Sequence, residues 1–265
     1  MSTQNDLAAR LKSLHEPGNP LIVTNVWDAI SAKTVAQLPN TKALATASFA
    51  VAAAAGLEDQ ELTLDVNLRA VEAVSKVAKA SNLPLTVDFQ DGFGDQLEAG
   101  VRKAIRLGTV GINLEDFGRE LGEKGGLYPI SEAQDRIRKV LKVAADEGIP
   151  DFVVNARTDA LLAGKTIDDA IERGKAFLEA GATNVFIWGG RERGGMKREE
   201  VEKAAKALGG KLNVILVRLV PGGLTVKELR EIGVARISVG PQLMLRSAPV
   251  VGEEAAKILA GEAAF

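Results

Sequence analysis

Short apolar runs alternate along this chain with longer stretches of helical period. The runs are rich in valine, isoleucine and leucine, whereas the stretches between them are rich in alanine, leucine, lysine and glutamate. This alternation is typical of βα units arranged around a parallel sheet. It predicts eight strands, at Pro20–Asn25, Ala43–Ser48, Pro84–Asp88, Val110–Leu114, Phe152–Ala156, Asn184–Trp188, Leu212–Val217 and Arg236–Gly240.

A weak internal repeat supports this count of strands. A helix end, a glycine and an apolar run recur in AIRLGTVGINLE, FLEAGATNVFIW and LREIGVARISVG, so that a glycine ends each helix and the next strand follows at once. No serine-rich or proline-rich linker divides the sequence. We therefore predict an α/β protein with one (β/α)8 TIM barrel over residues 1–265, rather than a doubly wound sheet, because such a barrel takes roughly 250 residues.

Polar residues collect where the predicted strands end, which is the face on which barrel enzymes carry their active sites. Asp88 and Glu115 follow the neighbouring third and fourth strands, and Arg157 follows the fifth. Two converging carboxylates suit a hard cation such as Mg²⁺, and a guanidinium can bind a carboxylate or phosphate in bidentate fashion. A plainer interpretation is also open, in which the acids cap helices and Arg157 pairs with Asp159 or Glu115.

A second corner of the predicted barrel gives a competing hypothesis. The segments Val220–Thr225 and Ser238–Gly240 follow the seventh and eighth strands, where many barrels bind phosphate. A phosphosugar enzyme would hold a phosphate at Gly222, Gly223 and Gly240. The earlier DGFGD segment fits neither the P-loop nor the GxGxxG spacing, so we expect no phosphate there.

Composition removes several classes of chemistry. Among the 265 residues there is no cysteine and a single histidine, which excludes disulfides, thiolate zinc sites, cysteine nucleophiles and multi-histidine metal sites. A formal net charge of -2 lacks the basic excess of a nucleic-acid-binding domain. The polar start shows neither a signal peptide nor a membrane span. We expect a cytoplasmic protein that acts on a small molecule.

Three other features have plainer interpretations. His15 precedes the first strand and is expected at the surface or in a helix. Trp27 and Trp188 fit a ligand wall and barrel-rim packing equally well. The charge-dense stretch Arg191–Lys206 is typical of a loop and the solvated face of a helix.

A family resemblance follows from six motifs that come in order along the chain: NVWDAISAK, TASFAVAAAAGLED, TVDFQDGFGD, INLEDF, NARTDALL and VKELREIGVARISVGP. Together they resemble the isocitrate lyase and phosphoenolpyruvate mutase superfamily, and more narrowly its cysteine-free phosphonomutase-like branch. The resemblance implies a modified barrel that assembles as a homotetramer, with the eighth helix exchanged between paired subunits. It also implies Mg²⁺-assisted chemistry through an enolate of a 2-oxo acid.

The resemblance assigns roles to particular residues. Asp88 would bind Mg²⁺ directly, while Gln90 and Glu115 would hold it through water. Ser48 and the neighbouring backbone amides would bind a substrate carboxylate, together with Arg157. Asp59 would lie on a gating loop and act in catalysis. Further substrate-binding candidates at the first and second strand ends are Trp27, Asp28 and Phe49.

Departures from the family pattern reduce the number of family activities that we expect of this chain. The lyases carry a KKCGH-type motif with a catalytic cysteine, and the corresponding stretch here is GRELGEKGGLYP. Gln90 stands where the metal loop commonly has a second aspartate, and Trp188 stands where the family has a glutamate. Relatives that decarboxylate oxaloacetate use a histidine near the seventh strand, where the nearest amide here, Asn213, is a catalytic candidate.

We therefore predict a Mg²⁺-dependent lyase that cleaves or decarboxylates a small 2-oxo or 2-hydroxy carboxylic acid through an enolate. One alternative is a carbon–phosphorus mutase or hydrolase of the phosphonopyruvate type, which would share the metal site. A second alternative is a barrel that has lost catalysis and persists as a binding protein.

Overall fold

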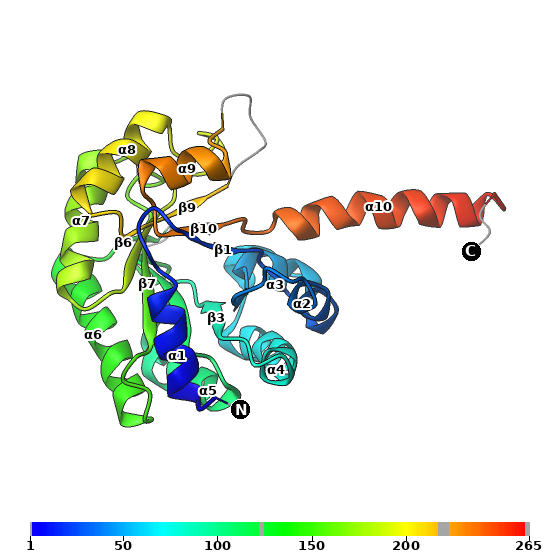
Figure 1. Cartoon of the computed structure of the whole chain (residues 1–265), viewed down its shortest axis with the longest axis horizontal. Helices are drawn as coiled ribbons and strands as arrows, with labels where there is room; N and C mark the ends of the chain where they lie inside the picture. The colour runs from blue at the N-terminus through cyan, green and yellow to red at the C-terminus, as the bar shows by residue number, and fades with distance from the viewer. Residues whose placement is uncertain (1, 122–124, 217–222, 263–265) are drawn as a thin grey trace.

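Eight parallel strands form the inner wall of the protein, in a computed structural model that describes residues 2–121, 125–216 and 223–262 (Figure 1). Their order in the sheet is β1-β10-β9-β8-β7-β4-β3-β2. Each predicted run overlaps one of them, although β4 and β7 end one and two residues later than predicted, so that Glu115 and Arg157 lie within strands. Val217, the end of the seventh run, lies outside the described residues. The strands are β1 (Leu21–Val23), β2 (Leu44–Ala45), β3 (Leu85–Asp88), β4 (Gly111–Glu115), β7 (Val153–Thr158), β8 (Asn184–Ile187), β9 (Leu212–Ile215) and β10 (Arg236–Ser238).

The two edges of this sheet meet and nearly close it into a barrel. A single parallel bridge pairs Val26, just after β1, with Thr46, just after β2. There the Val26 N–H donates to the Ala45 oxygen at 2.8 Å. The predicted TIM-barrel fold is confirmed.

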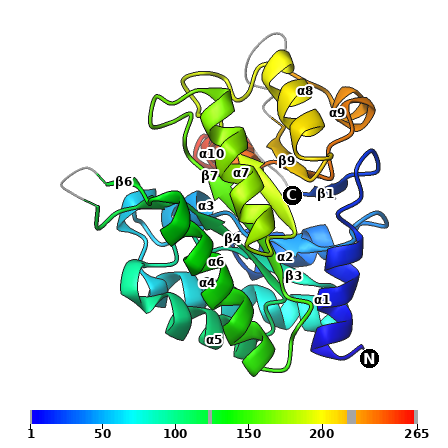
Figure 2. The ribbon, with the colours of Figure 1, turned by 90° about the vertical axis from the view of Figure 1, so that its left-hand side faces the viewer.

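Helices cover the outside of the barrel, and helices that follow one another around it pack together (Figures 1 and 2). Two short antiparallel strands, β5 (Phe117–Gly118) and β6 (Gly126–Leu127), and two 3-10 turns, η1 (Asp59–Glu61) and η2 (Gly94–Gln96), lie in the connections. The helices before the last are α1 (Gln4–Ser13), α2 (Ala29–Ala36), α3 (Ser48–Ala54), α4 (Leu64–Ala80), α5 (Leu97–Leu107), α6 (Ile130–Asp146), α7 (Ile167–Glu179), α8 (Arg198–Ala207) and α9 (Val226–Ile232).

Strand side chains alternate between two environments, as the period of two requires. One set belongs to the buried apolar clusters and includes Val87, Ile112, Val154, Val185 and Val214. The alternate set is buried and largely polar and includes Thr86, Asn113, Asn155, Asn184, Asn213, Arg236 and Ser238. The barrel is therefore packed with apolar side chains on its helical side and with hydrogen-bonding side chains on its inside.

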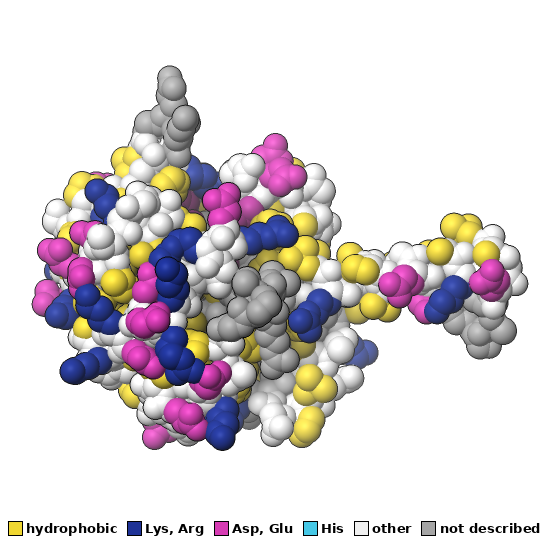
Figure 3. Space-filling model, turned by 90° about the horizontal axis from the view of Figure 1, so that it is seen from above, with side chains coloured by type: hydrophobic (Ala, Val, Ile, Leu, Met, Phe, Trp, Pro, Cys, Tyr) yellow, Lys and Arg dark blue, Asp and Glu magenta, His cyan; other side chains and the backbone are white. Residues whose placement is uncertain are grey.

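The last helix, α10 (Gln242–Leu259), extends away from the barrel as an arm (Figures 1 and 3). None of its residues is buried. Its exposed large apolar side chains are Leu245, Val250, Val251, Ile258 and Leu259. Across the described residues, we find no helix with the length and apolar character needed to span a bilayer.

Candidate active site

A cavity of about 260 Å³ opens at the carboxyl ends of the strands. It lies where the βα loops of a barrel meet, which is the usual place of the active site in this fold. Residues from most of the strand ends contribute to it. The lining includes Asn25, Ser48, Phe49, Asp59, Asp88, Asn113, Arg157, Phe186, Trp188, Arg191, Ser238 and Gln242.

Asp88, the last residue of β3, is held rigidly at the cavity floor. Its N–H donates to Thr46 Oγ1 at 2.9 Å, and its Oδ2 accepts the Ser48 N–H at 3.0 Å. Its other carboxylate oxygen, Oδ1, is buried and has no hydrogen-bond partner in the described part of the chain. A buried carboxylate oxygen without a partner is costly unless something binds it. The site thus presents one unpaired anionic oxygen.

Residues around Asp88 fit a magnesium ion held mainly by one carboxylate. Among the described residues there is no cluster of three acidic, histidine or cysteine side chains that could bind a metal, and Gln90 and Glu115 bond to other side chains instead. Mg²⁺ commonly keeps several waters and uses only one or two carboxylates. Asp88 Oδ1 would therefore hold the ion directly. Neither Gln90 nor Glu115 is part of the cavity lining, so their water-mediated roles stay predictions.

Arg157 on β7 joins two acids beside the cavity. Its Nε and one terminal nitrogen donate to the two carboxylate oxygens of Asp159, at 2.8 and 3.0 Å, and its other terminal nitrogen lies 3.0 Å from Glu115 Oε2. Burial alone would lower the pKa of Arg157, but Asp159 and Glu115 outweigh it and raise that pKa. The plainer ion-pair interpretation is therefore correct, and Arg157 also lines the cavity.

The pKa of Glu115, at the end of β4, is shifted in opposite directions by its surroundings. Burial raises its pKa well above the usual range, Arg157 opposes this, and the negative charges of Asp159 and Asp88 raise it further. The acids and the single arginine therefore share one buried network. A cation bound at Asp88 would relieve the repulsion among these carboxylates.

Asp59, in η1, reaches the cavity from above and is held by Gln90. The Nε2 of Gln90 donates to both the backbone oxygen and Oδ1 of Asp59, at 2.9 Å each. Burial and the negative charge of Asp88 raise the pKa of Asp59. Gln90 has a φ of 47°, in the left-handed region that non-glycine residues rarely adopt, so the local backbone is strained to point this amide at Asp59.

Comparison with known proteins identifies the family. The sequence profile described as phosphoenolpyruvate phosphomutase matches residues 11–259. The chain belongs to the phosphoenolpyruvate mutase/isocitrate lyase superfamily. The resemblance seen in the motifs is thereby confirmed.

Relatives within this superfamily have differing activities. The 2-methylisocitrate lyase of Escherichia coli (strain K12) is 35% identical over 193 residues, which are 66% of this chain and 62% of that enzyme. The structure of a candidate phosphonomutase from Burkholderia cenocepacia J2315 is 33% identical with a TM-score of 0.82, covering 98% of this chain and 100% of the other. A phosphonopyruvate hydrolase, solved with oxalate and Mg²⁺, is 25% identical with a TM-score of 0.82, covering 98% and 88%. The superfamily thus includes lyases, mutases and hydrolases.

The segment that replaces the cysteine motif of the superfamily's lyases contributes an arginine to the site. Arg119, next to β5, donates to the backbone oxygen of Gln60 at 2.7 Å and to the side-chain oxygen of Gln90. It therefore fastens the η1 segment from the opposite side. No local sequence pattern predicts this role, because Arg119 and Gln60 are 59 positions apart.

Several candidates predicted from the sequence lie away from the cavity lining. Asp28 caps α2 by accepting the Ser31 N–H at 2.7 Å. Trp27 packs against the small apolar cluster that contains Val51. Asn213 is fully buried inside the barrel, where it donates to Ser238 Oγ at 3.2 Å. Ser48, Phe49 and Trp188, by contrast, do line the cavity.

The cavity also includes side chains that the sequence did not single out. Asn113 lies two positions before Glu115, the last residue of β4, so the strand period would have placed both on the inner face. Arg191 lines the cavity although its charge-dense stretch had suggested only a solvated loop. Its exposed position in a long connection gives no sequence signal for this.

The corner that carries the phosphosugar hypothesis has its amides already bonded. Asn25 Oδ1 accepts the N–H groups of Val239 and Gly240, at 3.1 and 2.9 Å. Gly223 is exposed, and Gly222 lies outside the described residues. The Gly240 amide is therefore occupied, which removes one of the donors that a phosphate would need at this corner.

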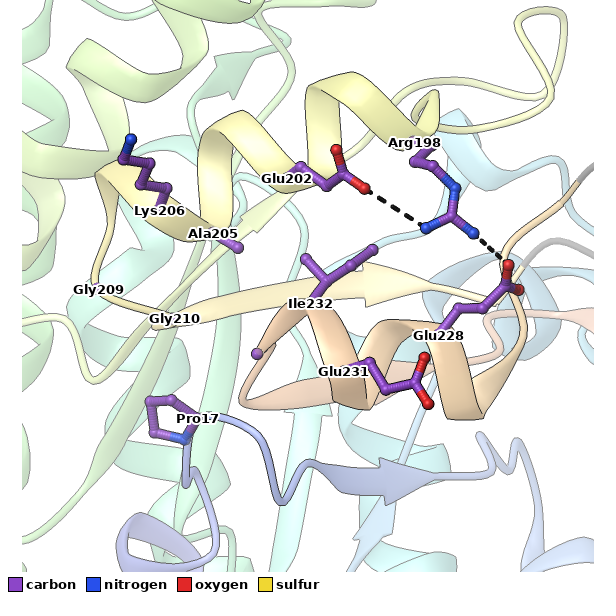
Figure 4. Close-up of a pocket in the computed structure, with 11 residues that line it drawn as sticks. Pro17, Arg198, Glu202, Ala205, Lys206, Gly209, Gly210, Glu228, Glu231 and Ile232 are labelled. Atoms are coloured by element: carbon purple, nitrogen blue, oxygen red, sulfur yellow. Dashed lines mark hydrogen bonds and ion pairs between the residues drawn. The ribbon is translucent and has the colours of Figure 1, made fainter.

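A larger hollow, of about 560 Å³, lies between α8 and α9 at the other end of the barrel (Figure 4). Its main charged groups are paired, since Arg198 bridges Glu202 and Glu228. It is lined by the residues that lead into the strands, such as Gly210 and Gly233. That end of a TIM barrel serves stability rather than catalysis, so we assign the active site to the smaller cavity.

Proposed function

We propose that the protein is a Mg²⁺-dependent lyase that forms the enolate of a small 2-oxo acid by cleaving a carbon–carbon bond or by decarboxylation. The observation that carries this proposal is the buried, unpartnered Oδ1 of Asp88 at the floor of the cavity. A solved relative binds Mg²⁺ and oxalate, and oxalate has the shape and charge of a small enolate. The superfamily membership supports the same chemistry.

The side chains of this chain account for substrate binding. The contacts of Arg157 with Asp159 and Glu115 engage three of the five N–H groups that a guanidinium offers. The remaining donors bind a substrate carboxylate. Arg191 lies in the same lining and offers a second cation, which favours a dicarboxylic acid over a monocarboxylic one.

The bond-breaking step leaves negative charge on the substrate, and stabilising that charge lowers the barrier to the step. The bound ion supplies Lewis-acid stabilisation of negative charge on the substrate oxygens. Asp88 keeps its position because Thr46 and Ser48 hold it, and the buried surroundings exclude water, which strengthens each of these interactions. Solvent or Asp59, which lies over the cavity, returns a proton to the enolate.

Replacing Asp88 with asparagine tests the proposal. The variant keeps the shape of the side chain but removes its charge, so we expect Mg²⁺ affinity, measured by calorimetry, to fall by about 100-fold or more. Turnover of a panel of 2-oxo and 2-hydroxy dicarboxylates should be lost with unchanged thermal stability. Unchanged turnover in this variant would contradict the proposal.

Two measurements on the native protein separate the alternatives. Phosphonopyruvate, followed by phosphorus NMR, detects a carbon–phosphorus mutase or hydrolase, since both activities change the phosphorus signal. A native protein that binds neither Mg²⁺ nor oxalate would support the non-catalytic alternative.

We also propose that the protein is a homotetramer in which α10 packs against a second copy. The carrying observation is that no residue of α10 is buried although it displays Leu245, Val250, Val251, Ile258 and Leu259. Figure 3 shows apolar side chains along an arm that the barrel leaves uncovered. Such a surface is unfavourable in water unless a partner covers it, and light scattering measures the assembly directly.

A further inference from the structure

A row of polar side chains crosses the barrel interior at the level of the cavity floor. Backbone pairing aligns Asp88 of β3, Asn113 of β4, Asn155 of β7 and Asn184 of β8 as successive neighbours on four adjacent strands. Neighbours in register face the same side of a sheet, which here is the inside. Asn155 and Asn184 are fully buried, whereas Asn113 is 7% exposed and lines the cavity.

Hydrogen bonds join the three amides in one direction. Asn184 Nδ2 donates to Asn155 Oδ1 at 3.1 Å, and Asn155 Nδ2 donates to Asn113 Oδ1 at 2.9 Å. The row begins at Asn184 Oδ1, a buried oxygen without a partner among the described residues. The reverse direction would leave a buried amide N–H group unpaired at that end, and in proteins such donors are rarer than unpaired carbonyl oxygens.

This direction decides what Asn113 offers to the cavity. A carboxamide has one acceptor oxygen and one NH₂ donor group. Asn155 occupies the oxygen of Asn113, so the NH₂ group is what remains for a ligand. Next to it in the row is Asp88, whose Oδ1 also lacks a partner within the described chain.

We propose that Asn113 is a substrate-binding residue, and that Asn155 and Asn184 are positioning residues that fix its NH₂ group toward the cavity. The NH₂ group donates to an anionic or carbonyl oxygen of the substrate beside Asp88. The same NH₂ group would stabilise negative charge that develops on this substrate oxygen during the reaction. The inference rests on the proposed function, because it takes the ligand to be a 2-oxo acid.

The row makes this donor more effective than a free asparagine. An asparagine at a surface can turn its amide to suit any partner, whereas Asn113 can do so only by breaking its bond to Asn155. Donors that are fixed before the substrate arrives need no reorganisation during the reaction. The row therefore selects ligands with an acceptor oxygen at this point of the cavity.

Two substitutions of Asn113 test its role at pH 8 with saturating Mg²⁺ and oxalate as the probe. Asn113→Asp keeps the shape and still accepts from Asn155, but turns an oxygen toward the ligand. Asn113→Leu removes the polar group. We expect oxalate affinity, measured by calorimetry, to fall about 10- to 100-fold in the leucine variant and further in the aspartate variant. Mg²⁺ affinity without oxalate should not fall in either variant.

Asn155 tests the direction of the row without changing the cavity lining. In Asn155→Asp the carboxylate only accepts, so Asn113 must turn its NH₂ group away from the cavity to bond with it. In Asn155→Leu the amide of Asn113 is merely released. We expect the aspartate variant to bind oxalate more weakly than the leucine variant, although aspartate is closer in shape to asparagine. A purely structural role for Asn155 predicts the opposite order.

Thr109→Val is the matched control, since it removes a buried, unpartnered polar atom just before β4, at the far end from the cavity. Its oxalate affinity should equal that of the native protein. The inference is overturned if the native protein binds oxalate and both folded Asn113 variants bind it equally well. If the native protein binds no oxalate with Mg²⁺ present, the proposed function itself fails and this inference fails with it.

Discussion

Gln90 holds Asp59 by two hydrogen bonds from a single nitrogen, to the backbone oxygen and to Oδ1, at 2.9 Å each. An aspartate at position 90, which the family pattern would suggest, has no donor for either bond and would add a negative charge next to Asp59. At this position the chain therefore has a neutral amide that holds the η1 segment over the cavity, instead of a negatively charged carboxylate that could help to bind a metal ion.

Gln90→Glu tests this exchange, because glutamate has the size of glutamine but lacks the donor. We expect two effects of opposite sign. Mg²⁺ affinity should rise about 10-fold from the added negative charge, while amide hydrogen exchange across Asp59–Glu61 should become faster from the lost hydrogen bonds. Slower exchange in this segment would contradict the proposed contact.

Arg157→Met should destabilise the protein strongly. It leaves Asp159 and Glu115 buried without their cation, and breaking a buried ion pair in this way costs about 3–5 kcal/mol. Urea denaturation measures the loss in the free energy of unfolding. Lys142→Met is the control, because Lys142 pairs with Asp146 on the exposed face of α6 and its loss should cost less than about 1 kcal/mol. Equal losses in the two variants would mean that the buried network is not stabilised by Arg157.

His15 should make the protein sensitive to acid. The ring donates from Nδ1 to the Leu11 oxygen at 2.8 Å and accepts from Arg236 at Nε2, at 3.4 Å. Burial and the positive charge of Arg236 lower the pKa of His15 to about 3. The unfolded chain then takes up a proton as the pH falls below about 6.5 while the folded protein does not, so stability is lost toward acid at up to about 1.4 kcal/mol per pH unit.

His15→Gln removes this titration. Urea denaturation at intervals from pH 7.5 to 5 should show a shallower loss of stability in the variant than in the native protein. The same slope in the native protein and in His15→Gln would exclude His15 as the source.

The arm formed by α10 should control the oligomeric state. Val250→Asp and Val251→Asp together place charge on the apolar surface of the arm, and we expect the proposed tetramer to dissociate into smaller species in light scattering. Ser247→Asp adds a charge at an exposed polar position of the same helix and serves as the control. A native protein that is monomeric at micromolar concentration would rule out the proposed exchange of α10.

Much of the fold follows from local patterns in the sequence. The eight strands were predictable because each is a short, mainly apolar run between stretches of helical period, and their order around the barrel follows from right-handed βα units. Asp88 and Arg157 were predictable as site residues because they stand at strand ends, which a barrel brings to one rim. The family motifs then added Asp59 and Gln90.

The missed features depend on contacts between distant parts of the chain. His15 was expected at the surface or in a helix. It lies directly after the end of α1 and meets Arg236, 221 positions away, at the amino end of β10. Asn155 and Asn184 join Asn113 only through the strand register, which no single segment encodes. Asp28 was taken as a ligand-binding residue, and the alternative that the sequence also allowed, a helix cap, describes its observed contact.

The bridge between Val26 and Thr46 has a consequence for how the barrel wall behaves over time. One backbone bridge and a hydrogen bond from Asn25 Nδ2 to the Thr46 oxygen, at 2.7 Å, join the two edge strands there. Asn25 and Ser48, within two positions of the bridge on either strand, both line the cavity. A ligand that contacts both residues would link the two edge strands at this junction. We expect bound ligand to slow amide exchange at Val26 far more than at Ile112, which lies in the continuous part of the sheet. Part of the binding free energy would then be used to suppress local opening between the two edge strands.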